Sequence, residues 1–274
     1  MMKVIYTDLD GSLLDHKSYS FAPAANFLER LENQAIPVIP VTSKTRAEVL
    51  SLRKSLNNRH PFIVENGAAI CLPKQYFDCS YVTVPADEDI QIISNSQPRH
   101  RWLDLLDQAG GAFAGEYQTF SSICADKGIG GLVELTGLSL EQATLAQQRE
   151  YSEPIHWLGS QTRKAEFIHQ IEQAGGQLLQ GGRFLTLGGN TDKGAAVLQL
   201  QALFQQQYGS CQSLAIGDSN NDISMLEAAD SALIIRSEHH RAPTPLRNTN
   251  LWHSTATGPN GWVEGVNAWL SEQY

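Results

Sequence analysis

Two pairs of aspartates stand where apolar runs end, a position in which carboxylates can bind a metal ion. Asp8 and Asp10 follow the first apolar run of the chain, and Asp218 and Asp222 follow a later one. Mg²⁺ prefers a few carboxylate oxygens together with waters and substrate phosphate. Clustered carboxylates repel one another, so a cation is needed to keep them ionised together. With Mg²⁺ bound, one aspartate could attack phosphorus and form an aspartyl-phosphate.

Each aspartate pair also has an interpretation without catalysis. Asp8-Leu9-Asp10-Gly11 alone could be a turn after a strand, and Asp218 to Asp222 matches the start of an EF-hand calcium loop. The calcium alternative fails because Ile223 stands at the sixth position, which needs glycine, and Ala229 at the twelfth, which needs glutamate. The turn alternative loses weight because other apolar runs end in polar residues too.

Four apolar runs typical of buried strands are followed by residues that could bind or react. These residues are Asp8 and Asp10, Thr42 and Ser43, Asn66 and Gly67, and Asp218 and Asp222. Helical patterns separate the first three runs: one apolar stripe runs from Ala24 to Leu31, and Thr45 with Glu48 forms a capping box for the next helix. Alternating strands and helices predict right-handed crossovers and a parallel sheet, with Ala68 to Leu72 as a hairpin arm. The carboxyl ends of parallel strands share one edge, so the four ends should converge.

The overall composition excludes several classes of protein. The 274 residues are 42% hydrophobic, which is ordinary for a globular protein of one large or two smaller domains. A net charge of −9 argues against a nucleic-acid-binding surface. The four cysteines, Cys71, Cys79, Cys124 and Cys211, are too widely spaced for a zinc knuckle or a disulfide framework. No leader or membrane-spanning run is evident, so we expect a cytoplasmic protein with no membrane partner.

The sequence pattern changes at about Pro85 and changes back before Lys193. Residues 86–188 combine weaker strand patterns with amphipathic helices and glycine pairs such as Gly181-Gly182. We expect a second α/β unit there, inserted into a domain formed by residues 1–85 and 189–274. The tail from Pro243 onward is rich in proline and glycine, so it is expected to be mostly loop before a last amphipathic helix.

Two further polar features each have a functional and a structural interpretation. Lys193 stands at the expected start of a helix, where its ammonium group could offset charge on phosphoryl oxygens, or it could simply face solvent. His239 and His240 suggest a metal site, but adjacent histidines in a polar loop are more often exposed, and we expect that here.

These features together resemble the haloacid dehalogenase (HAD) superfamily of phosphotransferases. The stretch Asp8-Leu9-Asp10-Gly11-Ser12-Leu13-Leu14 is similar to its first motif, Thr42 to its second, Lys193 to its third, and Gly217 to Asp222 to its fourth. The resemblance implies an α/β fold: a Rossmann-like core with a parallel sheet and an inserted α/β cap of the C2 type, which closes over the site and selects substrates.

The resemblance also implies a role for each residue that matches a motif. Asp8 would be the nucleophile, and Asp10 the general acid and then the general base. Thr42, Ser43 and Lys193 would hold the phosphoryl group. The implied cofactor is Mg²⁺, with Asp8, Asp10 (through its backbone carbonyl), Asp218 and Asp222 as the metal-binding set. An acid at Asp10 can protonate a poorly leaving alkoxide, which favours phosphoester hydrolysis or a mutase reaction over ion pumping.

Within the superfamily, five stretches are similar to the mannosyl-3-phosphoglycerate phosphatases. They are Val41 to Thr45, Glu65 to Ala68, Glu134 to Ser139, Arg149 to Ile155 and Gly258 to Trp262. The resemblance implies a small phosphorylated sugar or glycerate as substrate. Its candidate contacts are Lys44, Asn66, Gly67, Arg183 and Asn221, although Lys44 and Arg183 could equally face solvent. Arg149, Ser152 and Glu153 could read sugar hydroxyls, but a structural role is favoured.

The function expected from the sequence is therefore Mg²⁺-dependent hydrolysis of a glycosyl-phosphoglycerate through an aspartyl-phosphate. Three alternatives stay open. The first is a phosphatase for another phosphosugar, such as glucosyl-3-phosphoglycerate or sucrose phosphate. The second is a phosphomutase, which would have to protect the phosphoaspartate from water. The third is a catalytically silent phosphosugar sensor, which is disfavoured because all four motif positions are filled.

Overall fold

The computed structural model describes residues 1–78, 84–85, 89–181 and 183–271. Cys79, Gly182 and residues 86–88, where the expected domain boundary falls, lie outside the described residues. The chain forms two compact units. The first unit comprises Met1–Ser43, Leu52–Ile93 and Asp192–Tyr274, and the second comprises Lys44–Ser51 and Ser94–Thr191.

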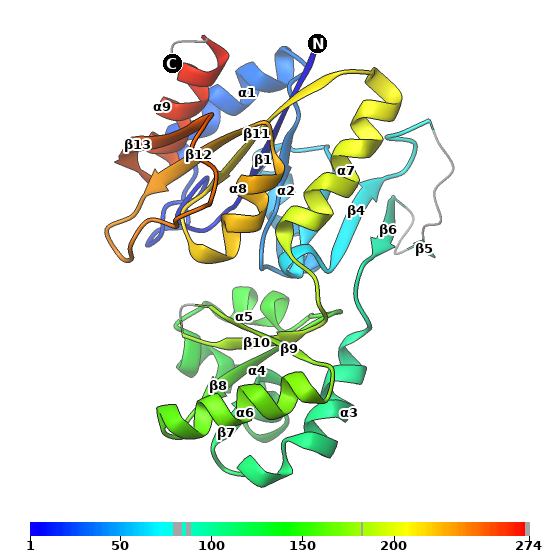
Figure 1. Ribbon diagram of the computed structural model, residues 1–274, viewed down its shortest axis with the longest axis vertical. Helices are drawn as coiled ribbons and strands as arrows, with labels where there is room; N and C mark the ends of the chain where they lie inside the picture. The colour runs from blue at the N-terminus through cyan, green and yellow to red at the C-terminus, as the bar shows by residue number, and fades with distance from the viewer. Residues whose placement is uncertain (79–83, 86–88, 182, 272–274) are drawn as a thin grey trace. The chain divides into compact units, whose positions relative to one another are not determined.

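A five-stranded parallel sheet forms the centre of the first unit, in the order β13-β12-β11-β1-β2 (Figure 1). Its strands are β1 (Met2–Thr7), β2 (Val38–Pro40), β11 (Cys211–Gly217), β12 (Ser231–Arg236) and β13 (Leu251–Thr257). Strand β1 lies between β11 and β2, although more than 200 residues of chain separate β1 from β11. The expected parallel sheet is confirmed, and with it the expected α/β fold class.

Helices cover both faces of this sheet because alternate strand residues point to opposite sides. Tyr6 of β1 packs into an apolar cluster with Val197 and Met225, whereas its neighbour Thr7 is hydrogen bonded to Trp262. The helices are α1 (Ala25–Asn33), α7 (Lys193–Tyr208), α8 (Ile223–Ala228) and α9 (Gly258–Leu270), with short 3₁₀ helices η1 (Ala22–Ala24) and η4 (Asn220–Asp222). Helix α2 (Arg46–Leu56) is divided between the two units. With both faces covered, the carboxyl edge of the sheet is where polar groups can gather.

A second sheet follows α2, in the order β3-β4-β6-β5. Its strands are β3 (Phe62–Val64), β4 (Ala69–Pro73), β5 (Val84–Pro85) and β6 (Ile90–Ser94). A parallel bridge between Val41 and Ile63 joins β3 to the end of β2. Strand β4 pairs antiparallel with β3, which confirms the expected hairpin arm. The turn between them, η2 (Glu65–Gly67), carries two of the candidate substrate-binding residues.

The tail after β12 is more regular than the sequence suggested. Strand β13 extends the central sheet, and α9 begins at Gly258 and contains Pro259 in its first turn. Proline is compatible with that position because its missing N–H would have no partner within the helix. Glu264 of α9 holds the helix to β13 by accepting hydrogen bonds from the backbone N–H groups of Thr255 and Ala256. The expectation of a loop up to the last helix was therefore wrong for β13.

The second unit contains an antiparallel sheet in the order β7-β8-β10-β9. Its strands are β7 (Tyr117–Thr119), β8 (Glu153–Trp157), β9 (Gln177–Gln180) and β10 (Leu185–Gly188). Its helices are α3 (Arg99–Ala109), η3 (Gly111–Phe113), α4 (Phe120–Thr136), α5 (Leu140–Ala146) and α6 (Gln161–Gln173). Trp102 of α3 and Phe167 of α6 share an apolar cluster with Ile155 of β8. A separate apolar cluster joins Phe120 of α4 to Ala143 of α5.

Within the described part of the chain, no helix combines the length and the apolar character that a membrane span requires.

Candidate active site

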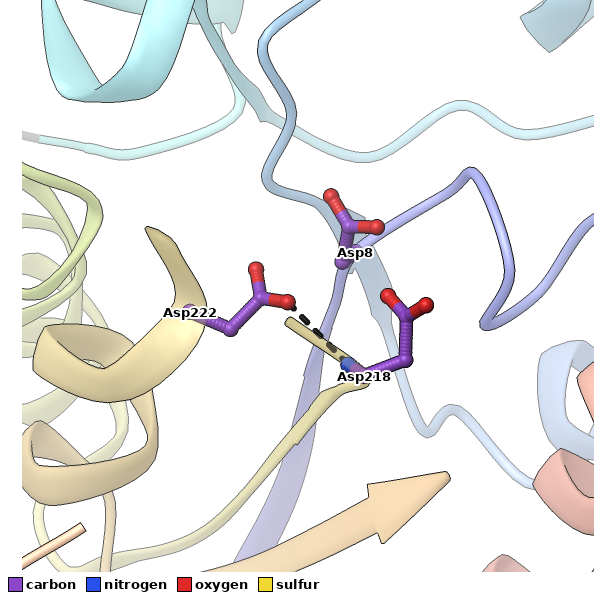
Figure 2. Close-up of side chains that lie close together, drawn as sticks. All are labelled: Asp8, Asp218 and Asp222. Atoms are coloured by element: carbon purple, nitrogen blue, oxygen red, sulfur yellow. Dashed lines mark hydrogen bonds between the residues drawn. The ribbon is translucent and has the colours of Figure 1, made fainter. Parts of the chain in front are cut away.

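Three carboxylates gather at the carboxyl edge of the central sheet. The N–H of Asp8, which follows β1, donates to the carbonyl of Ile216 in β11 at 2.8 Å, so the ends of the two strands lie together. Oxygens of Asp8, Asp218 and Asp222 all lie within 4.8 Å of one another. Figure 2 shows the Asp8 and Asp218 side chains side by side and the Asp222 carboxylate directed toward the Asp218 backbone. All three are buried, which confirms the expected convergence of the first and fourth polar strand ends.

Lys193 is part of this cluster. Its Nζ donates to Asp8 Oδ1 at 2.6 Å and to Asp222 Oδ1 at 2.7 Å, and the residue is 1% exposed. Burial would lower the pKa of Lys193, but the charges of Asp222 and Asp8 outweigh burial and raise it. The lysine therefore stays protonated and holds the two carboxylates in place. The alternative that Lys193 faces solvent is wrong.

One lysine does not balance the charge of three buried carboxylates. Burial raises the pKa of Asp8 well above its usual range, and Asp222, Asp218 and Asp10 add to the rise while Lys193 opposes it. Burial and the Asp222 charge raise the pKa of Asp218 to about 6. Both carboxyl groups are thus held at a cost in their ionised form, and a further cation among them would remove that cost.

The free oxygens in the cluster fit a hard metal ion. Asp218 Oδ1 is buried and has no hydrogen-bond partner among the described residues. Asp222 differs, because its Oδ1 accepts from Lys193 and its Oδ2 accepts from the N–H groups of Asp218 and Ser219 at 3.1 and 3.0 Å. Carboxylate oxygens without a proton donor are the ligands that Mg²⁺ selects. Asp8 and Asp218 are therefore the side chains best placed to hold Mg²⁺, with Asp222 orienting Lys193 and the Asp218 backbone.

The loop after Asp8 is shaped to pack against Asp218. Asp10 is partly buried, and its carboxylate is not one of the three that cluster. Gly11 has a φ of +82°, and its N–H donates to the carbonyl of Leu14 at 2.9 Å. A Cβ atom at Gly11 would lie 2.4 Å from Asp218 Oδ2. Both the left-handed backbone and the close approach require glycine here.

Thr42 lies at the neighbouring strand end. The N–H of Val41 donates to the carbonyl of Thr7 at 2.8 Å, so the residue after Val41 lies beside the end of β1. Thr42 is 1% exposed, and its own N–H donates to the carbonyl of Ile63 at 3.0 Å. Ser43 follows it and is partly buried. The structure thus brings Thr42 to the edge of the sheet that carries Asp8.

The helix after Ser43 starts as its sequence predicts. Thr45 Oγ1 accepts from the Glu48 N–H at 3.1 Å, and Glu48 Oε2 accepts from the Thr45 N–H at 2.8 Å, which confirms the capping box. Lys44 Nζ lies 3.9 Å from Glu48 Oε1 and is only partly exposed. Lys44 is therefore not the freely solvated lysine that was one of its two interpretations.

Asn66, Gly67 and Asn221 lie against the beginning of α7. Glu65, Asn66 and Gly67 have φ values of 47°, 57° and 93°, three successive residues in the left-handed region. A Cβ on Gly67 would lie 2.1 Å from the carbonyl oxygen of Asp192, the residue before Lys193. Asn221 Nδ2 donates to Asn66 Oδ1 at 3.3 Å. Strain of this kind is typical of functional sites, and here it positions the Asn66 amide beside the fourth motif.

Arg183 belongs to the second unit, where it caps a helix. Its guanidinium donates to the carbonyls of Leu135 at 3.3 Å and Thr136 at 2.6 Å, at the end of α4. A cation at a helix carboxyl terminus is favourable because it meets the negative end of the helix dipole. If Arg183 binds an anionic substrate, as predicted, it must do so with the guanidinium N–H groups that do not bond these two carbonyls.

Glu153 of the second unit is completely buried in a closed network. Its Oε2 accepts from Arg99 Nε at 2.5 Å and from Ser121 Oγ at 3.1 Å, and its Oε1 accepts from the Ser121 N–H at 2.8 Å. Arg149 donates to Ser152 Oγ at 3.0 Å. These contacts are those of a structural element, the interpretation that the sequence favoured.

Two contacts of the carboxylate cluster were not foreseen. Both histidines are exposed, as the sequence predicts, but His240 Nε2 also lies 3.0 Å from Asp218 Oδ2, a contact that the sequence did not suggest. No sequence signal links a histidine in an irregular loop to an aspartate 22 residues earlier. Trp262 Nε1 donates to Thr7 Oγ1 at 2.9 Å, and Thr7 Oγ1 donates to the Asp8 carbonyl at 2.7 Å. The stretch Gly258 to Trp262 was a usable signal for this second contact.

Known proteins share both the sequence and the fold. Residues 5–106 and 164–243 match the family of haloacid dehalogenase-like hydrolases. The chain is 34% identical over 266 residues to a glucosyl-3-phosphoglycerate/mannosyl-3-phosphoglycerate phosphatase of Methanococcoides burtonii, covering 97% of this chain and 96% of that protein. The chain belongs to the haloacid dehalogenase-like hydrolases.

Further relatives agree with this assignment. A Persephonella marina protein of the same name is 32% identical over 272 residues, covering 98% of this chain and 97% of that protein. A crystal structure from Thermoplasma acidophilum has a TM-score of 0.67 at 17% identity, with each chain covered completely. The likeness to it concerns the fold alone. With phosphatases as near-full-length relatives, this hydrolase is a phosphoric monoester hydrolase.

Proposed function

We propose that this hydrolase removes the phosphoryl group from a glycosyl-3-phosphoglycerate, with mannosyl-3-phosphoglycerate as first candidate, through an aspartyl-phosphate on Asp8. The observation that carries the chemistry is the cluster in which Lys193 bridges Asp8 and Asp222 while Asp218 Oδ1 has no partner among the described residues. The substrate class rests on the names of the two relatives, which both act on glucosyl- and mannosyl-3-phosphoglycerate. The products would be inorganic phosphate and a glycosylglycerate, a reaction expected in the cytoplasm.

The first step is attack by Asp8. Lys193 donates to Oδ1 at 2.6 Å and so fixes the carboxylate that attacks phosphorus. The new O–P bond forms as the bond from phosphorus to the glycerate oxygen breaks. Asp10 donates its proton to that departing alkoxide. Bound Mg²⁺, held by Asp8, Asp218 and the Asp10 carbonyl, would supply charge neutralisation for the phosphoryl oxygens.

The second step releases phosphate. Asp10, now ionised, takes a proton from water as the water oxygen attacks phosphorus, and the bond from phosphorus to Asp8 breaks. Lys193, Thr42 and Ser43 hold the phosphoryl oxygens through both steps. The ammonium of Lys193 needs no movement to do so, because two carboxylates already fix it.

Substrate choice is assigned to residues outside this reacting centre. Asn66, Gly67 and Asn221 are proposed to bind the substrate, together with Lys44 and Arg183. Residues 86–188 are proposed to be the C2-type cap that selects the sugar. The packing of Asn66 against Asn221 supports the first part of this assignment.

A substrate panel tests the proposal. Phosphate release is measured with mannosyl-3-phosphoglycerate, glucosyl-3-phosphoglycerate and sucrose phosphate, with and without Mg²⁺. We expect the highest kcat/KM for a phosphoglycerate ester and no activity for Asp8→Asn. A preference for sucrose phosphate would overturn the substrate class, and Mg²⁺-independent release or an active Asp8→Asn would overturn the mechanism. Transfer of phosphate to a second hydroxyl, rather than to water, would identify a mutase.

A further inference from the structure

Of the three clustered carboxylates, only Asp218 has no hydrogen bond to Lys193. Asp8 and Asp222 are each fixed by a hydrogen bond to the lysine. The side chain of Asp218 has a single hydrogen-bond partner among the described residues, His240, whose Nε2 lies 3.0 Å from Oδ2. The aspartate side chain is 3% exposed, so bulk solvent has little access to its oxygens.

We propose that His240 is a positioning residue that fixes the Asp218 carboxylate with Oδ1 directed to the metal ion. The inference rests on the proposed function, because it concerns the Mg²⁺ site of that reaction. A carboxylate can only accept hydrogen bonds, so the hydrogen between the two residues is on His240 Nε2. By engaging Oδ2, the imidazole leaves Oδ1 as the oxygen without a partner, which is the state of a ligand atom.

Local packing makes this orientation specific. Gly11 lies so close to Oδ2 that a Cβ there would come within 2.4 Å of it. Gly11 and His240 therefore both restrict the position of Oδ2, Gly11 by packing closely against it and His240 by a hydrogen bond. Outer partners that orient metal ligands typically change metal affinity by about 10- to 100-fold when they are removed. His240 is a candidate for an effect of this size.

The neighbouring histidine supplies a matched control. His239 does not contact Asp218; its ring stacks on that of His16, with the ring centroids 4.2 Å apart and the planes inclined by 25°. The two histidines share the same loop and the same side chain, but only one reaches the carboxylate. A general effect of histidine loss on this loop would appear in both variants, whereas an effect on the ligand would appear in one.

The experiment is calorimetric titration of the metal-free full-length chain with Mg²⁺ alone. We compare the wild type with His240→Ala, His240→Gln and His239→Ala, each checked for its melting temperature without metal. The Kd for Mg²⁺ should rise by about 10- to 100-fold in His240→Ala. It should return to within a few-fold of wild type in His240→Gln, because the amide Nε2 can donate in place of the imidazole. His239→Ala should bind Mg²⁺ as the wild type does.

Three results would overturn the proposal. The first is wild-type affinity in His240→Ala, and the second is an equal loss in His239→Ala. The third is a folded His240→Gln that binds as weakly as His240→Ala. These results leave the proposed function standing if the wild type binds Mg²⁺ and turns over substrate. A wild-type chain that binds no Mg²⁺ would instead remove the metal site itself, and the positioning role with it.

Discussion

Two clusters of buried charge, one in each unit, differ in how completely their carboxylates are satisfied. In the second unit Glu153 is fully buried, and Arg99 and Ser121 together supply a donor to both of its oxygens. In the first unit Lys193 bonds two of the three buried carboxylates, Asp8 and Asp222, and one oxygen of the third, Asp218, has no partner among the described residues. Figure 2 shows the three carboxylates. We call the Glu153 cluster of the second unit closed and the carboxylate cluster of the first unit open.

This difference distinguishes a structural ion pair from a cluster that can bind a metal ion. A closed pair has no capacity to bind anything else, and it is costly to break because one charge would be left buried alone. In the open cluster the raised pKa values of Asp8 and Asp218 indicate that their ionised forms are destabilised by burial. A bound cation would stabilise these ionised forms. Burial of charge is common to both clusters, so the unsatisfied oxygen is the feature that indicates function.

The largest expected effect comes from removing the one cation of the open cluster. Lys193→Met takes away the group that fixes Asp8 and that would meet the phosphoryl oxygens. We expect kcat to fall by about 10³-fold, because loss of one charge-stabilising donor alone costs about 10²–10³. Steady-state kinetics at saturating Mg²⁺ measures it, with circular dichroism to confirm folding. A change of less than tenfold would mean that the lysine is structural, like Arg99.

Breaking the closed pair should affect stability and leave metal binding alone. Glu153→Ala leaves Arg99 largely buried without its partner, which should lower the free energy of unfolding by about 3 kcal/mol. Glu116→Ala removes a more exposed partner of Arg163 and should cost much less than Glu153→Ala. Denaturant titration gives both values. If Glu153→Ala also weakened Mg²⁺ binding, the two clusters would not be independent.

Metal binding should stabilise the open cluster in a pH-dependent way. At a Mg²⁺ concentration of about 100 Kd, the stability gain is about 2.7 kcal/mol. Because burial raises the pKa of Asp218 to about 6, the metal-free folded chain holds that proton more tightly than the unfolded chain. This stabilisation is present below the unfolded pKa of about 4 and is lost as the pH rises through about 6.

Mg²⁺ takes the place of the proton, so the rise in melting temperature on adding Mg²⁺ should be larger near pH 8 than near pH 5. Melting curves with and without Mg²⁺ at both pH values measure this difference. An equal rise at both pH values would show that the metal ion does not compete with protons on these carboxylates.

The smallest expected effect concerns the hydrogen bonds behind Asp8. Trp262→Phe removes the donor to Thr7, which itself donates to the Asp8 carbonyl, and should cost about 1 kcal/mol with a few-fold lower kcat. Trp269 is the control, because its Nε1 is buried with no partner among the described residues. Trp269→Phe should cost less than Trp262→Phe and leave kcat unchanged. Thermal melts and kinetics on both variants decide this, and equal losses would contradict it.

The sequence was sufficient to predict the parallel sheet and the position of the open cluster. Short apolar runs ending in polar residues are local signals, and parallel geometry alone brings their ends to one edge. That reasoning placed Asp8 with Asp218, and the helix-start pattern placed Lys193 at the first residue of α7. The capping box at Thr45 is local in the same sense.

What the sequence could not predict depends on irregular loops or on contacts between distant elements. His240 reaches Asp218 from a loop without periodicity, and Trp262 reaches Thr7 across 255 residues. Strand β13 was missed because prolines and glycines surround it and most of its side chains remain partly exposed. A structural role was favoured for Glu153 from the sequence, but only the structure identifies the partners that satisfy its charge.

The most direct test of the open cluster is to trap the phosphoryl group on Asp8. Asp10→Asn should slow the attack of water but not the first step when the leaving group needs no proton, so brief incubation with Mg²⁺ and an aryl phosphate, followed by acid quenching, should preserve the acyl phosphate. Peptide mapping by mass spectrometry should then find one added phosphoryl group on the peptide that contains Asp8, and none in Asp8→Asn/Asp10→Asn. Turnover with no adduct at Asp8, or an adduct on any other residue, would contradict Asp8 as the nucleophile.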